Sequence, residues 1–255
     1  MRLFDTHAHY DADAFDADRM EVLSSMPGQG VELILNPGCD LKSSQTAVEL
    51  AERFPFVYAA VGVHPEECAD WNAEHDIPVL EALAQNPKVR AIGEIGLDYH
   101  WPENPPRELQ QQVFHAQLDL AEKLNLPVIV HDRDAHHDCL DIVRAHPNVT
   151  GVYHCYSGGV EDAKTLMKLG WMISFTGSIT FKNARRALEV IDLLPLDRMM
   201  IETDSPYMSP EPFRGRRNDS GRVHLVAEAI ARRKGLDPEE VARITLENGK
   251  RFFRI

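Results

Sequence analysis

The amino-acid sequence predicts an α/β protein folded as a single (β/α)8 TIM barrel that spans residues 1–255. Eight short apolar runs alternate with longer stretches of helical pattern, and eight such units in 255 residues match the size of this barrel. The runs are apolar nearly throughout, as in Val128-Ile129-Val130, which is typical of parallel strands covered on both faces. The rival fold is an open doubly wound sheet, and it loses its best marker because no glycine-rich nucleotide-binding motif occurs.

The predicted strands are the apolar runs, and the predicted helices lie between them and after the last one. The strands cover Leu3–His9, Val31–Gly38, Val57–Pro65, Ala91–Asp98, Pro127–Asp132, Val149–Gly158, Trp171–Ser178 and Arg198–Pro206. The helices cover about Asp18–Met26, Leu41–Phe54, Asp76–Gln85, Arg107–Leu126, Ala135–Ala145, Val160–Leu169, Asn183–Leu194, Arg222–Lys234 and Pro238–Phe253. Asp40 is a predicted N-cap and Pro238 stands at a first helical position, while Gly170 and Gly235 are placed for left-handed C-terminal caps.

Six of the eight runs end in histidine, aspartate or glutamate; the second and the seventh do not. The carboxyl ends of barrel strands meet at one face, so these side chains are expected to converge there. A polar group at such a place costs desolvation free energy unless it is paired or bound to metal. Imidazoles and carboxylates together are ligands of transition metals. The residues concerned are His7, His9, His64, Glu94, His131, His154, Glu202 and Asp204.

The first run carries two of these histidines, His7 and His9, in positions that point to the same side of a strand, about 6–7 Å apart. A His-x-His pair alone is a weak motif, but it gains weight from the ligand-type residues at the other strand ends. The predicted metal ligands are His7, His9, Glu94, His131, His154 and Asp204. His64 precedes a proline and either shapes its loop or contacts substrate. Cys155 is expected to point away from His154, into the core.

The charge balance limits the function classes. The chain has 27 basic and 40 acidic residues and a formal net charge of −13, which excludes coating of nucleic acid by charge alone. The excess acid lies in residues 1–127, with 8 basic and 22 acidic side chains, whereas residues 128–255 carry 19 and 18. A polyanion would therefore have to be bound at a local site.

The loop after the eighth run is the best candidate for such binding, because arginine forks suit bidentate contact with phosphate. A solvated surface loop is the competing interpretation of this charge run. The predicted substrate contacts are Arg133, Arg214, Arg216 and Arg217, with His64 and Glu202 as further candidates near the metal ligands.

The four cysteines show no CxxC spacing, and the first residues contain no apolar stretch typical of a signal peptide. No run is long and apolar enough to predict a transmembrane helix. We therefore expect a cytoplasmic protein with reduced thiols and no membrane partner, either a monomer or a small homo-oligomer.

The strand-end segments together resemble the signature segments of TatD-family metal-dependent hydrolases over nearly the whole chain. The segments are Asp5-Thr6-His7-Ala8-His9, Gly62-Val63-His64-Pro65, Gly93-Glu94-Ile95-Gly96-Leu97-Asp98-Tyr99, Val130-His131, His154-Cys155-Tyr156-Ser157-Gly158 and Glu202-Thr203-Asp204-Ser205-Pro206-Tyr207. The resemblance implies an amidohydrolase-like barrel and a metal-dependent deoxyribonuclease with two divalent ions, Zn, Mn or Mg. It also implies that His7, His9 and Asp204 hold one ion, that His131 and His154 hold the other, and that Glu94 bridges the two.

Two such ions would activate a shared water and neutralise a phosphate oxygen during in-line displacement. In this hypothesis Asp204 and Glu94 are the catalytic carboxylates, and Asp204 orients the water and accepts its proton. Glu202, two residues earlier, is expected one layer deeper, where it would support the ligands.

The leading functional prediction is a deoxyribonuclease, 3'-5' exonuclease-like, with single-stranded DNA or DNA ends as its partner. The same ligands also serve C–O and C–N hydrolysis, so an ester or amide hydrolase such as a D-aminoacyl-tRNA deacylase is the alternative. A non-catalytic metal-binding protein is the third interpretation, and the intact ligand set disfavours it.

Overall fold

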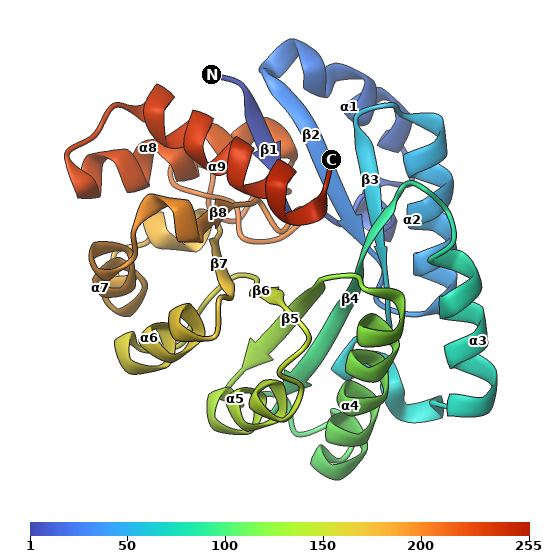
Figure 1. The fold of residues 1–255 in the computed structure, drawn as a ribbon. Helices are drawn as coiled ribbons and strands as arrows, with labels where there is room; N and C mark the ends of the chain where they lie inside the picture. The colour runs from blue at the N-terminus through green and yellow to red at the C-terminus, as the bar shows by residue number, and fades with distance from the viewer.

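The computed structural model describes residues 1–255, and its eight strands form one parallel sheet hydrogen-bonded in chain order. This confirms the predicted (β/α)8 TIM barrel, with the strands inside and the helices around them (Figure 1). The strands are β1 (Leu3–Asp5), β2 (Val31–Pro37), β3 (Val57–Val61), β4 (Val89–Asp98), β5 (Val128–Arg133), β6 (Gly151–Tyr153), β7 (Met172–Phe175) and β8 (Met199–Ile201).

Nine α-helices follow the predicted order, and most of their bounds differ from the predicted ones by one to three residues. They are α1 (Arg19–Ser25), α2 (Leu41–Arg53), α3 (Ala73–Leu83), α4 (Arg107–Leu124), α5 (His136–Ala145), α6 (Val160–Lys168), α7 (Arg185–Leu193), α8 (Val223–Lys234) and α9 (Pro238–Phe253). None of them combines the length and the apolar character needed to cross a membrane.

The predicted helix caps are present. The Asp40 carboxylate accepts a hydrogen bond from the Ser43 backbone N–H at 2.6 Å, which satisfies a free donor at the start of α2. Gly170 and Gly235 adopt left-handed conformations, with φ of 83° and 67°, just after α6 and α8. Helix α3 starts earlier than predicted because the side chain of Asn72 accepts from the Glu74 N–H and caps it there.

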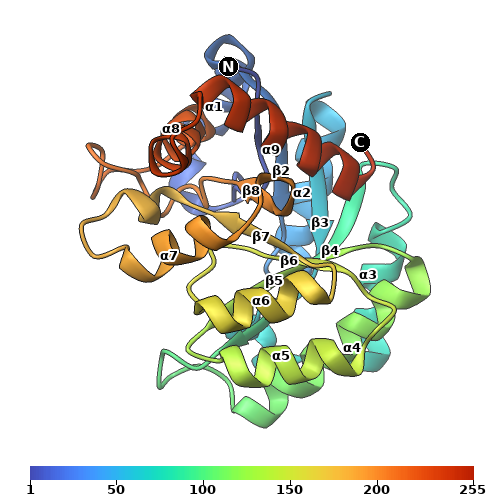
Figure 2. The same ribbon diagram turned by 60° about the vertical axis from the view of Figure 1, so that its left-hand side comes forward.

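Two layers of apolar side chains hold the barrel together. The larger cluster, with 56 buried residues, fills the space between the strands and the surrounding helices. The smaller cluster of 11 residues lies inside the barrel, where every strand contributes at least one side chain, such as Phe4 from β1 and Met200 from β8. Leu246 and Phe253 of α9 complete this inner cluster, so α9 closes the amino end of the barrel (Figure 2).

The barrel closes where the first strand meets the last. Residues just after β1 and β8 form a parallel bridge between Ala8 and Ser205, and the His9 N–H donates to the Ser205 carbonyl at 2.7 Å. The fully buried carboxyl of Asp5 accepts from the backbone N–H of Thr203 at 2.8 Å and from its hydroxyl at 2.5 Å. We call this set of contacts the β1–β8 seam.

Five strands end earlier than predicted. The structure ends β1 at Asp5, β3 at Val61, β6 at Tyr153, β7 at Phe175 and β8 at Ile201, whereas the apolar pattern extended each of them by three to five residues. The segments beyond them remain buried because they line the carboxyl end of the barrel, and burial is what the apolar pattern reports. The ligand-type residues of these segments therefore follow the strands.

We predict that Asp5→Ala lowers the free energy of unfolding by about 2–4 kcal/mol, because two buried donors of Thr203 lose their acceptor. Urea unfolding followed by circular dichroism measures the change. Asp40→Ala is the matched control, since loss of a helix N-cap costs about 1 kcal/mol. An Asp5→Ala effect no larger than that of the control would contradict the role given to the seam.

Candidate metal centre

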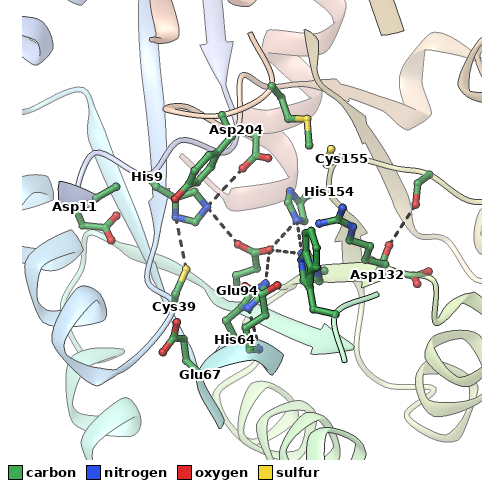
Figure 3. A pocket seen from close by; sticks show the side chains of 18 residues that line it. His9, Asp11, Cys39, His64, Glu67, Glu94, Asp132, His154, Cys155 and Asp204 are labelled. Atoms are coloured by element: carbon green, nitrogen blue, oxygen red, sulfur yellow. Dashed lines mark hydrogen bonds and ion pairs between the residues drawn. The ribbon is translucent and has the colours of Figure 1, made fainter. Parts of the chain in front are cut away.

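The side chains predicted to bind metal converge at the carboxyl end of the barrel. A cavity of about 600 Å³ opens there, lined among others by His9, His64, Glu94, His131, His154 and Asp204 (Figure 3). His7 is fully buried beside it, with its Nε2 atom 3.0 Å from Nε2 of His9. All six predicted ligands therefore lie in one cluster, with His64 beside them.

Glu94 lies at the centre of this cluster, and its two carboxylate oxygens face different histidines. Oε2 is 3.1 Å from Nε2 of His7 and 3.4 Å from Nε2 of His9. Oε1 is 2.9 Å from Nδ1 of His131 and 2.7 Å from Nε2 of His154. One carboxylate thus joins two groups of imidazole nitrogens, as the dashed lines around Glu94 in Figure 3 illustrate.

The backbone of β4 places Glu94 at this point. The pairing of β4 with β5 shifts register between Ile92 and Ile95, and such an irregularity redirects the side chain that it contains. Gly96 follows with φ of 139°, and a Cβ atom there would lie 2.0 Å from the carbonyl oxygen of His131. Only glycine allows β4 to pass so close to β5, so the glycines of this motif position Glu94 against His131.

The group around Oε2 of Glu94 is completed by Asp204. Its Oδ1 atom lies 3.8 Å from Nε2 of His7 and 3.6 Å from Nε2 of His9. The β1–β8 seam sets this approach, because the Asp204 N–H donates to the His7 carbonyl at 2.9 Å. Asp204 adopts a left-handed conformation, with φ of 56°, at the turn after β8.

The histidines around Oε1 are oriented by carboxylates behind them. Nε2 of His131 lies 3.0 Å from Asp98, and Nδ1 of His154 lies 3.4 Å from Glu202. Glu202 also accepts from the Cys155 N–H at 2.6 Å, so it lies behind the ligand cluster, as expected. No role was predicted for Asp98. It lies four positions after Glu94 on the same strand, and residues at an even spacing on a strand point to the same side.

Three further residues belong to the neighbourhood of the cluster. Nε2 of His64 is 3.4 Å from Oε1 of Glu94, while its Nδ1 accepts from the Glu66 N–H at 3.1 Å. The Sγ atom of Cys39 is 3.7 Å from Nδ1 of His9, a contact that no sequence motif indicates. The expectation that Cys155 points into the core was wrong, because it follows the end of β6 in a turn with φ of 41° and lines the cavity.

The family can be assigned once this geometry is known. The sequence profile described as TatD related DNase matches residues 4–254 of the chain. The chain belongs to the TatD family of metal-dependent hydrolases. The motifs that carry this assignment are the ones whose side chains meet at the carboxyl end of the barrel.

Individual TatD relatives are similar over their full length. The uncharacterized metal-dependent hydrolase YabD of Bacillus subtilis is 44% identical over 255 residues, which cover 99% of either chain. A protein of Salmonella typhimurium named 3'-5' ssDNA/RNA exonuclease TatD is 32% identical over 262 residues, with 99% of either chain covered. The crystal structure of the Escherichia coli TatD homolog YJJV superposes with a TM-score of 0.93 and 31% identity, covering 100% of this chain and 98% of that one.

The donor set fits the divalent cations of a TatD hydrolase. Burial lowers the pKa of both His7 and His64 to about 4, so these imidazoles are neutral at pH 7, the form that binds metal. Burial disfavours ionisation of Glu94, but the facing His154 and His7 outweigh it and hold its pKa well below the usual range.

Burial lowers the pKa of His131 as well, but Asp98 and Glu94 outweigh it and raise that pKa to about 9, and the pKa values of His9 and His154 are also raised. A cation that binds here would therefore displace protons from these rings. Imidazole nitrogens around carboxylates are a transition-metal site.

The four arginines predicted to contact substrate lie in three different surroundings. Arg133 lines the metal cavity, and its guanidinium lies 5.1 Å from the ring centroid of Trp101. Arg217 is committed to an ion pair with Asp18 at 2.6 Å, which also explains why Asp18 does not cap α1. Arg214 and Arg216 line a neighbouring cavity of about 480 Å³ that shares Tyr207 and Met208 with the metal cavity.

We predict that Asp98→Ala lowers metal affinity by about 10–100-fold, because His131 loses the carboxylate that orients its ring. Metal retained per chain after dialysis against a graded chelator measures this loss. Asp98→Asn keeps an oxygen acceptor for His131 and should retain more metal than Asp98→Ala. Equal metal retention by the native chain and Asp98→Ala would refute the role of Asp98.

Proposed function

We propose that this TatD-family hydrolase is a 3'-5' exonuclease for single-stranded DNA and frayed ends that works with two divalent cations. The observation that carries the proposal is that the two carboxylate oxygens of Glu94 face different histidines. Oε2 faces His7 and His9, and Oε1 faces His131 and His154. A carboxylate with one oxygen directed at each of two donor groups is suited to bridge two ions.

The first ion would be held by His7, His9 and Asp204, and the second by His131 and His154. When bound, the two cations would supply Lewis acidity that activates water and neutralises charge on the phosphoryl oxygens. Asp98 and Glu202 act behind the ligands by fixing the ring orientation of His131 and His154.

Asp204 is the proposed acceptor of the proton from the attacking water. Burial raises its pKa to about 6 while no cation is bound, and a bound cation would lower that pKa, so the carboxylate would be ionised and able to accept a proton. Its carboxylate reaches the edge of the cavity, where substrate can approach. His64 and Arg133 line the same cavity and would contact the phosphodiester.

A polynucleotide strand is the substrate that best suits the surroundings of this centre. Trp101 and Tyr207 line the cavity and remain 44% and 60% exposed, so their rings are available to stack on unpaired bases. Several relatives carry the name 3'-5' ssDNA/RNA exonuclease, among them the Salmonella typhimurium protein and one from Rahnella. Those names support the 3'-5' direction of degradation, and the sequence resemblance to metal-dependent deoxyribonucleases supports DNA as the substrate.

Glu94→Gln should abolish the bridge while keeping the shape of the side chain. We predict that metal content falls from two ions per chain and that hydrolysis of bis(p-nitrophenyl) phosphate drops by more than about 100-fold, since even loss of an outer partner costs about 10–100-fold. Elemental analysis and initial rates measure the two effects. Native metal content together with native activity would refute the bridging assignment.

A substrate panel tests the reaction itself. With Mg²⁺, Mn²⁺ or Zn²⁺ present, a 5'-labelled single strand should yield a ladder of products shortened from the 3' end, and chelation should stop it. Blunt duplex DNA should be degraded more slowly because its ends must first fray. D-aminoacyl-tRNA serves as the competing ester substrate, and deacylation of it without any cleavage of DNA would replace the exonuclease proposal.

A further inference from the structure

The metal cavity adjoins a second cavity that no sequence motif indicates. This second cavity has a volume of about 650 Å³, lies beyond the carboxyl end of β7, and shares Cys155, Ser157 and Met208 with the metal cavity. Its outer side is formed by the start of α7, including Arg185 and Arg186. A strand bound at the metal centre could therefore pass over these shared residues into the second cavity.

The basic side chains of this second cavity are exposed and available. Arg186 donates to the Ser157 carbonyl at 3.5 Å, which holds its guanidinium at the junction of the two cavities. Arg185 pairs with Glu189 at 2.9 Å, but its side chain is 90% exposed. An exposed ion pair of this kind contributes little to the free energy of folding, so the guanidinium can bind another anion instead. Arg214 continues the basic side, with its guanidinium 4.3 Å from the ring centroid of Phe181, which lines both this cavity and the next.

The opposite side of the metal cavity is acidic. Asp11, Glu66 and Glu67 line it near the ends of β1 and β3. Figure 3 shows Asp11 and Glu67 on the side of Cys39, across the metal cluster from Cys155 and Asp132. The acidic residues belong to the chain half with 22 acidic and 8 basic side chains, and the arginines belong to the other half. On the arginine side, the carboxylate of Asp132 pairs with His136 at 2.8 Å and that of Glu189 pairs with Arg185 at 2.9 Å. A polyanion is therefore attracted to that side of the opening more than to the acidic side.

We infer that a single polynucleotide strand reaches the metal centre from the β7–β8 side, with backbone phosphates on Arg185 and Arg186. This path rests on the proposed function and adds a binding surface to it. The strand end enters the metal cavity, and the acidic side disfavours continuation of the strand past Glu66 and Glu67. Because one side of the cavity opening attracts the strand more than the other does, binding of a strand end is favoured over binding of an internal segment.

The test compares binding by two double variants that remove the same charge. R185A/R186A alters the proposed path. R53A/R232A changes exposed arginines at the carboxyl ends of α2 and α8, which lie at the opposite end of the barrel. The probe is a fluorescein-labelled, hydrolysis-resistant phosphorothioate oligothymidylate of about 20 nucleotides, titrated with metal-loaded protein and followed by anisotropy.

We expect R185A/R186A to weaken binding by roughly tenfold at low salt and to reduce the slope of log K against log salt by about 1.4, or ~0.7 per lost phosphate contact. R53A/R232A should bind like the native chain, and both double variants should hydrolyse bis(p-nitrophenyl) phosphate at the native rate. E66Q/E67Q should bind the strand as tightly as the native chain or more tightly.

Equal binding by R185A/R186A and R53A/R232A, or no binding by the native chain, would overturn the proposed path. A several-fold loss in E66Q/E67Q would place the strand on the acidic side and overturn it as well. Failure of the proposed function would give a different result from failure of the proposed path. Arginine-dependent binding without any hydrolysis of single strands would refute the exonuclease and leave the path standing.

Discussion

Closure of the barrel between its first and last strands is the constraint on which the site depends. The buried Asp5 carboxyl binds Thr203 through two hydrogen bonds, and the backbone beyond them pairs His9 with Ser205 and His7 with Asp204. Residues almost two hundred positions apart thereby become neighbours. Because the same contacts close the sheet and assemble one group of metal donors, loosening the seam would disturb stability and metal binding together.

Glu94 divides the histidines of the centre into two donor groups. Burying so many polar atoms costs free energy, and further carboxylates beside the histidines reduce this cost. His131 and His154 each have a second ring nitrogen that loses its hydration on burial. Asp98 forms a hydrogen bond with that of His131, and the carboxylate of Glu202 lies 3.4 Å from that of His154, where it supplies a facing negative charge. The same contacts restrict ring rotation, so the donors keep their orientation before any ion binds. Preorganisation of this kind improves metal affinity without adding a ligand.

The sequence predicted the fold and the ligand cluster because both are properties of strands. Parallel strands leave long apolar runs, and the polar residues that end six of the eight runs point to a shared face, as with His131 and Glu94. Contacts made across loops left no such periodic signal. Cys39 and the turn that exposes Cys155 depend on local backbone geometry, and Arg185 and Arg186 lie at a helix start where charged residues are usually only solvated. Asp98 differs, because its even spacing from Glu94 on β4 was a usable signal.

Helix α9 closes the end of the barrel opposite the metal centre, and it brings the two chain termini to that end (Figure 1). The amino group of Met1 lies 3.0 Å from Glu239 in the first turn of α9. An affinity tag or a surface linker attached at either terminus would consequently point away from the cavity. The enzyme could be immobilised by its termini with its opening facing the solution.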